Sequence, residues 1–365
     1  MVAQKEDSLA VIDERLGYPV VTGTNLRGTI ARWLADVGTP RIALLCDGAD
    51  SVVAFAERLR ELVRGADRPI PVVLGERRKR MRTVEAVLDA LAGAGVGRDW
   101  TIVGVGGGVA ADLFGLAAAL FMRGVPYVHV ATTLVAMADA AIGGKTGVNL
   151  RAGKNLAGLF RNPAAVFCDV DALRTLPVRS VREGLAEIVK HALIDGDAFL
   201  RRLEELSTTA FERWPWVEIV GRSQQVKIAV VSRDALESGE REVLNLGHTF
   251  AHAIERASGY RISHGAAVAL GLRAATMLAV RLGAAPQAFA DRITALLQAL
   301  GFPMHLRLTT EDVVEAMAAD KKRRGGQVRF VVPAAPGSIT TGVKVPVPVI
   351  VQVLTDLRAM PRSRR

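Results

Sequence analysis

The sequence has few cysteines and few aromatic residues, and both shortages exclude classes of protein. Two cysteines among 365 residues cannot form a disulfide framework, so we expect a reducing, cytoplasmic setting. Aromatic residues make up 5% of the chain, which leaves little material for stacking on nucleic-acid bases. No apolar run is clean enough for a membrane span, because the longest, residues 103–121, contains Asp112 and several glycines.

Acidic residues are outnumbered by basic ones, 37 to 47, which gives a formal net charge of +10. The basic residues are scattered, with local runs only at 77–79, 321–324 and the C-terminal tail. We therefore expect anionic small molecules as ligands, and neither nucleic acid nor a membrane. The first 17 residues carry acidic groups where a secretion signal needs an apolar run, so export by that route is not expected.

Two compositional halves predict two domains. In residues 1–180, short Val- and Ile-rich runs alternate with helical patterns, which predicts an α/β Rossmann-like domain with a parallel sheet. In residues 181–365, long helical patterns predict an all-α domain, and the Pro-rich runs 329–333 and 340–349 predict extended structure outside a sheet core. The predicted strands are 19–22, 41–46, 70–74, 101–105, 127–131 and 165–168. The predicted helices are 53–63, 83–93, 181–193, 198–206, 217–231, 246–257, 266–282 and 286–300.

Gly106, Gly107 and Gly108 follow a predicted strand and precede a helix. Glycines let the backbone approach a pyrophosphate, and a helix N-terminus offers N–H groups to it. This pattern favours a dinucleotide site, although its spacing departs from G-x-G-x-x-G and a tight strand-to-helix turn would use the same residues.

A second polar cluster contains Asp139, Lys145, Lys154 and Asn155. Its lysines and amide suit a phosphate monoester, whereas an ordinary loop is the alternative. Function is favoured because Asp139 and Lys145 interrupt an apolar stretch, where an unpaired buried charge is costly.

Helical spacing groups several metal-binding side chains in the second half. Glu187 and Lys190 lie one turn apart, His248 and His252 are four residues apart, and His264 precedes a predicted helix. One carboxylate and two imidazoles with an open position are typical of catalytic zinc. Each histidine has the alternative of an ordinary hydrogen-bonded helix residue, and His252 has the further alternative of facing the substrate.

Lys227, Glu237 and Arg241 form a further charged group upstream of these histidines. A solvated helix face and an anion site both explain this group.

These residues belong to blocks that resemble the 3-dehydroquinate synthase family of sugar-phosphate cyclases. The resemblance runs from Gly75 to Lys322 through GGGVAADLFGLAAALFMRG, TTLVAMADAAIGGKTGVN, GKNLAGLF, TLP, GLAEIVKHALI, ESGEREVLNLGHTFAHAIE and HGAAV. Seven blocks in one order are far more specific than any single motif.

The resemblance implies a role for each matching position. The implied zinc (or cobalt) ligands are Glu187, His248 and His264. The implied NAD-binding residues are Glu76, Lys79, Gly106, Gly107, Gly108, Asp112, Thr132, Thr133, Lys145, Lys154 and Thr175. The implied phosphate and substrate contacts are Arg123 (reaching across a homodimer), Asp139, Lys145, Lys154, Asn155, Lys190, Asn245 and His252. Lys227 and Arg241, with Glu237 beside them, would bind a carboxylate, and either Lys321 or Lys322 would complete the site.

The implied reaction is the elimination of phosphate from 3-deoxy-arabino-heptulosonate 7-phosphate and closure of the ring to 3-dehydroquinate, in the shikimate pathway. The expected arrangement places metal, nicotinamide and a cationic pocket around one alcohol, which NAD oxidises and later restores. Retention of the carboxylate-binding pair favours this keto acid or its amino analogue over sedoheptulose 7-phosphate.

Alternatives to this function remain open from the sequence. Ala131, Ala235 and the pair 110–111 depart from the family pattern, so a cyclase of secondary metabolism is one alternative. A metal-dependent polyol dehydrogenase and a basic binding protein without catalytic activity are the others.

Overall fold

The computed structural model describes residues 9–39, 41–323 and 328–359, and side chains for residues 12–39, 41–318 and 328–359 within them. The chain forms two compact units. The first extends to Val181 and includes Pro215–Ser232, and the second contains Arg182–Trp214 and the chain from Arg233 onward.

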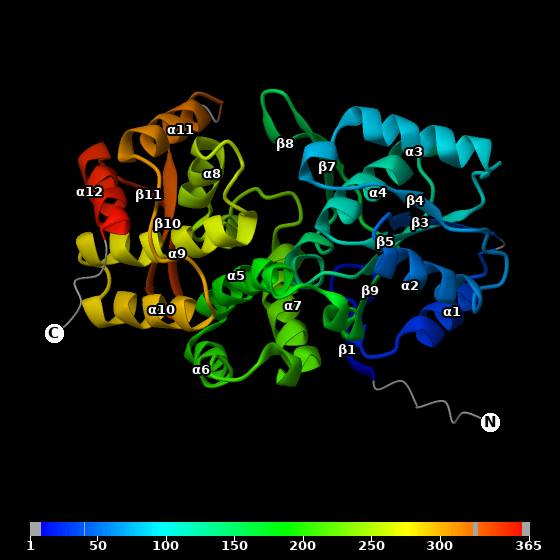
Figure 1. Cartoon of the computed structure of the whole chain (residues 1–365), viewed down its shortest axis with the longest axis horizontal. Helices are drawn as coiled ribbons and strands as arrows, with labels where there is room; N and C mark the ends of the chain where they lie inside the picture. The colour runs from blue at the N-terminus through cyan, green and yellow to red at the C-terminus, as the bar shows by residue number, and fades with distance from the viewer. Residues whose placement is uncertain (1–8, 40, 324–327, 360–365) are drawn as a thin grey trace. The chain divides into compact units, whose positions relative to one another are not determined.

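The first unit is built on a seven-stranded sheet with the order β1-β2-β9-β6-β5-β3-β4 (Figure 1). All neighbouring strands are parallel except β1 and β2. The chain order reverses between β3 and β5, and ligands of open α/β sheets bind beyond the strand ends at such a point. The strands are Leu9–Asp13 (β1), Val20–Gly23 (β2), Ile42–Asp47 (β3), Ile70–Val72 (β4), Thr101–Gly106 (β5), Tyr127–Ala131 (β6) and Ala165–Asp169 (β9).

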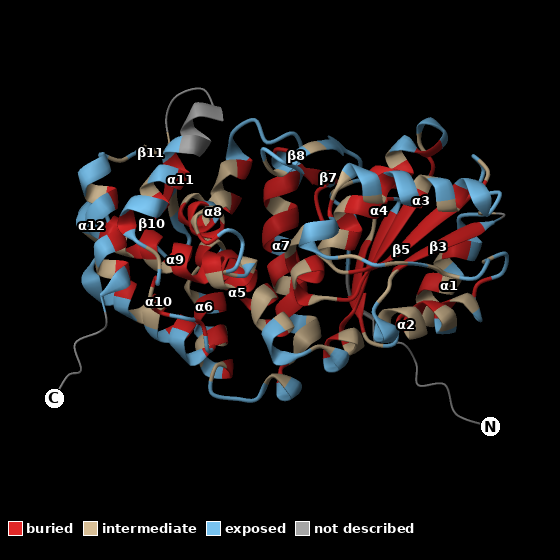
Figure 2. Ribbon diagram, turned by 45° about the horizontal axis from the view of Figure 1, so that its top comes forward, coloured by how far each residue is buried: buried red, intermediate tan, exposed pale blue. Residues whose placement is uncertain are grey.

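Helices cover both faces of this sheet and bury it, as the colouring in Figure 2 shows. On one face, Val103 and Val105 of β5 pack with side chains of α1 (Arg27–Asp36) and α2 (Asp50–Arg60). On the other, Ile102 packs with α3 (Met81–Gly93) and α4 (Gly108–Leu120). Successive side chains of one strand therefore pack into hydrophobic cores on opposite faces of the sheet. Because both faces are buried, nearly every residue of the strand is apolar, which explains the continuous apolar runs that predicted a parallel sheet.

Two parts of the first unit differ from the expectation. Lys145–Leu150 (β7) and Gly153–Phe160 (β8) form an antiparallel hairpin where the sequence predicted no strand. Helix α7 (Trp216–Arg233) was expected in the helical domain of residues 181–365. It belongs to the first unit as far as Ser232. The functional division into residues 1–180 and 181–365 stays a proposal.

The second unit is helical and carries one two-stranded hairpin. Its helices are α5 (Val178–Asp195, which starts in the first unit), α6 (Asp197–Leu206), α8 (His248–Ala257), α9 (His264–Arg281), α10 (Gln287–Ala299), α11 (Thr310–Arg323) and α12 (Val347–Arg358). Arg329–Ala335 (β10) pairs with Ser338–Lys344 (β11) apart from the large sheet. The prediction of extended structure through 349 is wrong at its end, because α12 begins there with a proline in its first turn.

Among the described helices, none has the length and the apolar character that crossing a bilayer requires.

Candidate metal and cofactor site

Helix α5 holds a buried carboxylate and a buried ammonium group side by side. The Nζ atom of Lys190 lies 2.6 Å from Oε2 of Glu187, and neither side chain is more than 2% exposed. Burial alone would raise the pKa of Glu187, but the charges of Lys190 and His248 hold it well below its usual value. The glutamate is therefore an anion, as a metal ligand must be.

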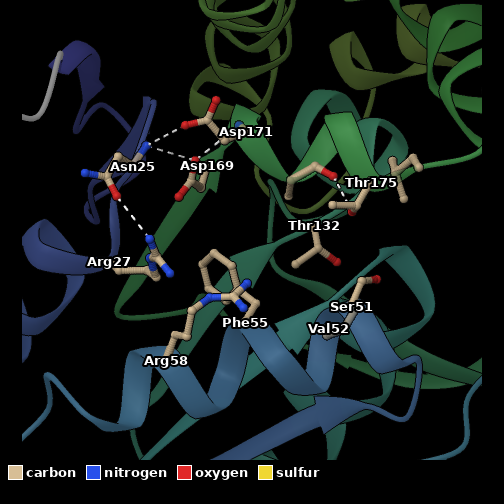
Figure 3. A pocket seen from close by; sticks show the side chains of 12 residues that line it. Asn25, Arg27, Ser51, Val52, Phe55, Arg58, Thr132, Asp169, Asp171 and Thr175 are labelled. Atoms are coloured by element: carbon tan, nitrogen blue, oxygen red, sulfur yellow. Dashed lines mark hydrogen bonds between the residues drawn. The ribbon is translucent and has the colours of Figure 1, made fainter. Parts of the chain in front are cut away.

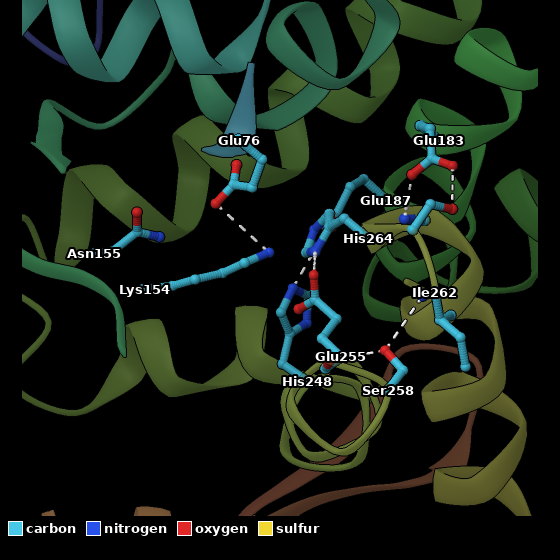
Figure 4. A network of polar contacts seen from close by, with 12 residues as sticks. Glu76, Lys154, Asn155, Glu183, Glu187, His248, Glu255, Ser258, Ile262 and His264 are labelled. Carbon is cyan, nitrogen blue, oxygen red and sulfur yellow. Dashed lines mark hydrogen bonds and ion pairs between the residues drawn. The ribbon is translucent and has the colours of Figure 1, made fainter. Parts of the chain in front are cut away.

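Two histidines at helix starts face the other oxygen of this carboxylate. The Oε1 atom of Glu187 lies 3.5 Å from Nε2 of His248, the first residue of α8, and 2.9 Å from Nε2 of His264, the first residue of α9. The three potential ligand atoms lie within 4.8 Å of one another (Figure 4). The structure thus brings together the three residues predicted as ligands, and their binding of metal stays a prediction.

An oxygen atom also lies near the second ring nitrogen of each imidazole. Nδ1 of His248 lies 3.2 Å from the carbonyl oxygen of Leu246, and Nδ1 of His264 lies 3.6 Å from Oε1 of Glu255. Burial alone would lower the pKa of His264, but Glu187 and Glu255 raise it to about 10. One carboxylate and two imidazoles that are oriented through their second nitrogens fit the donor set of zinc. Glu255, which received no role from the sequence, supplies part of that orientation.

His252 lies outside this group of three. Its side chain is exposed one turn further along α8, with its ring centroid 5.3 Å from that of His248. This placement leaves its predicted role toward substrate as a prediction.

The loop before α8 carries three more predicted residues of the second unit, Glu237, Arg241 and Asn245. Asp234 accepts hydrogen bonds from the backbone N–H groups of Ser238, Gly239 and Arg241 at 2.7–3.0 Å. The guanidinium group of Arg241 is buried and donates to the carbonyl oxygen of Ala235 at 2.8 Å. The loop is therefore tightly organised around one carboxylate.

Other predicted residues lie on or beyond this loop. Glu237 is exposed at a φ of 61°, and Asn245 ends the short helical turn Glu240–Asn245. The side chains of Lys321 and Lys322 lie outside the described residues.

In the first unit, the predicted pyrophosphate turn joins β5 to α4. A Cβ atom on Gly106 would lie 2.5 Å from Cβ of Ala110, and one on Gly107 would lie 2.9 Å from Cγ2 of Thr133. Larger residues would therefore distort the turn. No side chain caps the start of α4, which leaves its N-terminal dipole for a ligand. Close packing explains why Gly106 and Gly107 are glycines. The uncapped N-terminus of α4 fits the binding of a phosphate group.

Below this turn, a network of polar side chains joins five predicted residues through Asn149, which the sequence analysis gave no role. Nδ2 of Asn149 donates to Oε1 of Glu76 at 2.7 Å, and its Oδ1 accepts from the N–H group of Asn155 at 2.9 Å. The buried Nζ of Lys79 donates to Asp112 and, at 2.6 Å, to Oδ1 of Asn155. The network consists of Glu76, Lys79, Asp112, Asn149, Lys154 and Asn155, with Lys154 3.6 Å from Glu76.

An ion pair between a buried lysine and a partly buried aspartate joins α7 to the helical turn Ala136–Ala140. Nζ of Lys227 lies 2.8 Å from Oδ1 of Asp139 and donates to its carbonyl oxygen at 2.6 Å. Lys145 begins β7 with an exposed side chain. Arg123 is exposed in a turn where it and Met122 both have positive φ, 68° and 47°.

Thr132 and Thr175 line a cavity of about 340 Å³ in the first unit (Figure 3). Thr132 is buried, and among the described residues its Oγ1 atom has no hydrogen-bond partner. An orphaned buried hydroxyl that faces a cavity of this size fits a small-molecule ligand. Sequence reasoning missed most of the lining, which includes Asn25, Arg27, Ser51, Phe55, Arg58, Asp169 and Asp171.

Comparison with known proteins identifies relatives along almost the whole chain. Models of the 3-dehydroquinate synthase N-terminal and C-terminal domains match residues 69–183 and 184–323. The 3-dehydroquinate synthase of Acidithiobacillus ferrooxidans is 39% identical over 354 residues, which are 95% of this chain and 97% of the relative. That of Mycobacterium leprae is 41% identical over 319 residues, 86% and 88% of the two chains.

Solved structures of cyclases resemble the fold closely. A 2-epi-5-epi-valiolone synthase from Streptomyces hygroscopicus, solved with NAD⁺ and Zn²⁺ bound, is 31% identical with a TM-score of 0.84 over 98% of both chains. A 2-deoxy-scyllo-inosose synthase, complexed with carbaglucose-6-phosphate, NAD⁺ and Co²⁺, is 25% identical with the same TM-score over 93% and 96% of the chains. An NADH-dependent butanol dehydrogenase from Thermotoga maritima, 16% identical with a TM-score of 0.64 over 93% and 96%, shares the fold alone.

Proposed function

The chain belongs to the 3-dehydroquinate synthase family, and from this premise we propose that it is an NAD- and zinc-dependent cyclase. It eliminates phosphate from 3-deoxy-arabino-heptulosonate 7-phosphate and forms 3-dehydroquinate. The observation that carries the proposal is the convergence of Glu187, His248 and His264 in a chain 39% identical to a 3-dehydroquinate synthase over 95% of its length.

The chain's own residues hold both cofactors. When bound, NAD accepts a hydride from a substrate alcohol and later returns it, and zinc or cobalt acts as a Lewis acid toward substrate oxygen. Glu187, His248 and His264 hold the metal, while Lys190 holds the second oxygen of the carboxylate. The turn 106–108 binds the pyrophosphate, and the other contacts to the dinucleotide come from Glu76, Lys79, Asp112, Thr132, Thr133, Lys145, Lys154 and Thr175.

The substrate is bound through its two anionic ends. Lys227 and Arg241, with Glu237 beside them, bind the carboxylate, and a guanidinium group suits this because it makes paired hydrogen bonds. Loss of a proton next to the transient ketone lets the C–O bond to phosphate break, with the electron pair leaving on phosphate. We assign the transfer of a proton to His252. The phosphate and remaining substrate contacts are Arg123, Asp139, Lys145, Lys154, Asn155, Lys190 and Asn245.

A test with two substrates separates this function from its competitors. Zinc-loaded protein with NAD is incubated with the keto acid phosphate or with sedoheptulose 7-phosphate, and phosphate release and product mass are measured. We expect turnover of the keto acid without net NADH. Turnover of sedoheptulose 7-phosphate alone would reject the carboxylate argument, and NADH accumulation without phosphate release would indicate a polyol dehydrogenase.

We further propose a cytoplasmic homodimer that engages neither nucleic acid nor membrane. Exposed apolar side chains lie on α4, on the turn that follows it and on β8, and they support a dimer interface that includes Arg123. These side chains are Leu120, Met122, Leu156, Leu159 and Phe160. Sedimentation of the protein at micromolar concentration tests this assembly, and a monomer there would reject it.

A further inference from the structure

Glu183 contacts the chain on both sides of a proposed metal ligand. It precedes Glu187 by one turn of α5. Its Oε1 atom accepts a hydrogen bond from Oγ of Ser263 at 2.5 Å, and its Oε2 atom accepts one from the N–H group of Gly265 at 2.6 Å. The residue between these two donors is His264 (Figure 4).

The contact between Glu183 and the N–H group of Gly265 replaces an N-cap hydrogen bond of α9, although Glu183 belongs to a different helix. The first N–H groups of any α-helix lack intrahelical partners, and a serine at the N-cap position usually accepts from one of them. The side chain of Ser263 makes no such bond, and the first turn of α9 contains no acidic residue. Glu183 supplies both the missing acceptor and a negative charge at the positive end of the helix dipole.

Close packing fixes the distance between the two helices. A Cβ atom on Gly265 would lie 2.5 Å from Cα of Glu183 and 2.7 Å from its carbonyl oxygen, so only glycine allows this approach. His264 is joined directly to this contact. The contact between Glu183 and Gly265 therefore sets the distance between α5 and α9. One turn further along α5, this distance places Nε2 of His264 2.9 Å from Oε1 of Glu187.

We infer that Glu183 is a positioning residue for the metal site, which fixes the His264 imidazole by holding Ser263 and Gly265. The inference rests on the proposed function in taking Glu187, His248 and His264 as metal ligands. It adds a carboxylate that touches neither metal nor substrate and acts through the backbone of α9. Second-layer contacts of this kind typically change metal affinity by about 10- to 100-fold.

Zinc affinity of the full-length protein tests the inference without any substrate. Metal-free parent, Glu183→Ala and Glu183→Gln are titrated with Zn²⁺ against a chromophoric chelator, and their unfolding in urea is recorded separately. We expect the Kd for zinc to rise about tenfold or more in Glu183→Ala. Glu183→Gln retains an oxygen acceptor for the N–H group of Gly265 and should recover part of this loss. The matched control is Glu205→Ala, because the exposed carboxylate of Glu205 pairs with Arg202 at 3.3 Å, away from the proposed metal ligands.

The outcomes distinguish positioning from general stabilisation. If Glu183→Ala unfolds more easily but binds zinc with the parent Kd, the residue is merely structural and the inference is wrong. If Glu183→Ala does not fold, Ser263→Ala decides, since it removes one of the two contacts. A Kd raised at least about threefold supports the inference, and an unchanged Kd overturns it. A parent protein that binds no zinc would reject the proposed metal site itself, and this inference with it.

Discussion

Lys190 holds one oxygen of Glu187 at 2.6 Å and thereby leaves the other oxygen facing two imidazoles. Both residues lie on α5, three positions apart, and both are buried. The ammonium group thus orients the carboxylate and offsets its charge in the metal-free chain. Bound Zn²⁺ would supply a second compensating charge at the same carboxylate.

Replacing Lys190 should therefore cost more stability without metal than with it. Lys190→Met leaves Glu187 buried without its closest cation, and we expect the metal-free protein to lose about 3 kcal/mol of unfolding free energy. The loss should be smaller in zinc-saturated protein. Urea denaturation with and without zinc measures both values, and Lys344→Met, at an exposed position, is the control. Equal losses in the two forms would contradict the proposed role of the metal.

Lys79 should matter both for stability and for cofactor binding. Its side chain, 5% exposed, donates to Asp112 and Asn155. Lys79→Met should destabilise the chain by up to about 3 kcal/mol, because the carboxylate of Asp112, which is only 20% exposed, loses its partner. It should also raise the Kd for NAD about tenfold or more, by disordering the network around Asn149. Denaturation and calorimetric titration with NAD measure the two effects.

A double variant provides the control for this prediction. Adding Asp112→Asn to Lys79→Met removes both charges, so part of the lost stability should return. Strictly additive losses would show that the two side chains do not depend on each other.

Short apolar runs made most of the sheet predictable. The strands β2, β3, β4, β5, β6 and β9 were expected within a few residues, because each is a short run rich in Val, Ile or Ala. The β7–β8 hairpin was not expected. Residues 146–149 of β7 are buried in succession and β8 is largely exposed, so neither strand shows a period-two pattern. The glycines and asparagines of the hairpin are residues that usually mark loops.

The cluster that we propose to bind metal was predictable and its supports were not. Residue type and helical spacing grouped Glu187 with the histidines of this region, and the family resemblance selected Glu187, His248 and His264 from them, which the structure brings together. Glu183 and Asn149 act through hydrogen bonds to residues 82 and 73 positions away, and no local pattern encodes such a partner. The cavity lined by Thr132 was not predictable either, because its other lining residues are far apart in the sequence, around the start of α1, in α2 and in the segment from the end of β9 onward.

Asp234 should affect substrate binding through the loop that carries Arg241. Asp234→Ala removes the acceptor for three backbone N–H groups, so the buried guanidinium group loses its fixed position. We expect kcat/KM for the keto acid phosphate to fall about tenfold or more, chiefly through KM. Asp234→Asn keeps one oxygen acceptor and should fall less. Asp291→Ala, at an exposed position, is the control, and parent-like kinetics in Asp234→Ala would contradict the prediction.

His129 should make the stability of the chain depend on pH. It lies within β6, 1% exposed, with Nδ1 2.8 Å from the hydroxyl group of Tyr127. Burial lowers the pKa of His129 from its usual 6.5 to about 3. Between these values the folded chain keeps the imidazole neutral while the unfolded chain takes up a proton. Its contribution to stability is therefore complete above pH 6.5 and falls by about 1.4 kcal/mol per pH unit as the pH drops toward 3.

Comparison of two pH values in parent and variant isolates this histidine from the other titrating groups. His129→Gln cannot be protonated, although it changes the absolute stability by removing the ring from the core. Urea denaturation at pH 7.5 and pH 5 should show that the parent loses about 2 kcal/mol more than His129→Gln over this interval, because the interval includes 1.5 pH units below 6.5. All other groups are common to the two proteins, so their contributions cancel in the difference. The same loss in both proteins would mean that His129 takes up its proton over the same pH range in the folded chain as in the unfolded chain, and that the sheet accommodates a buried charge.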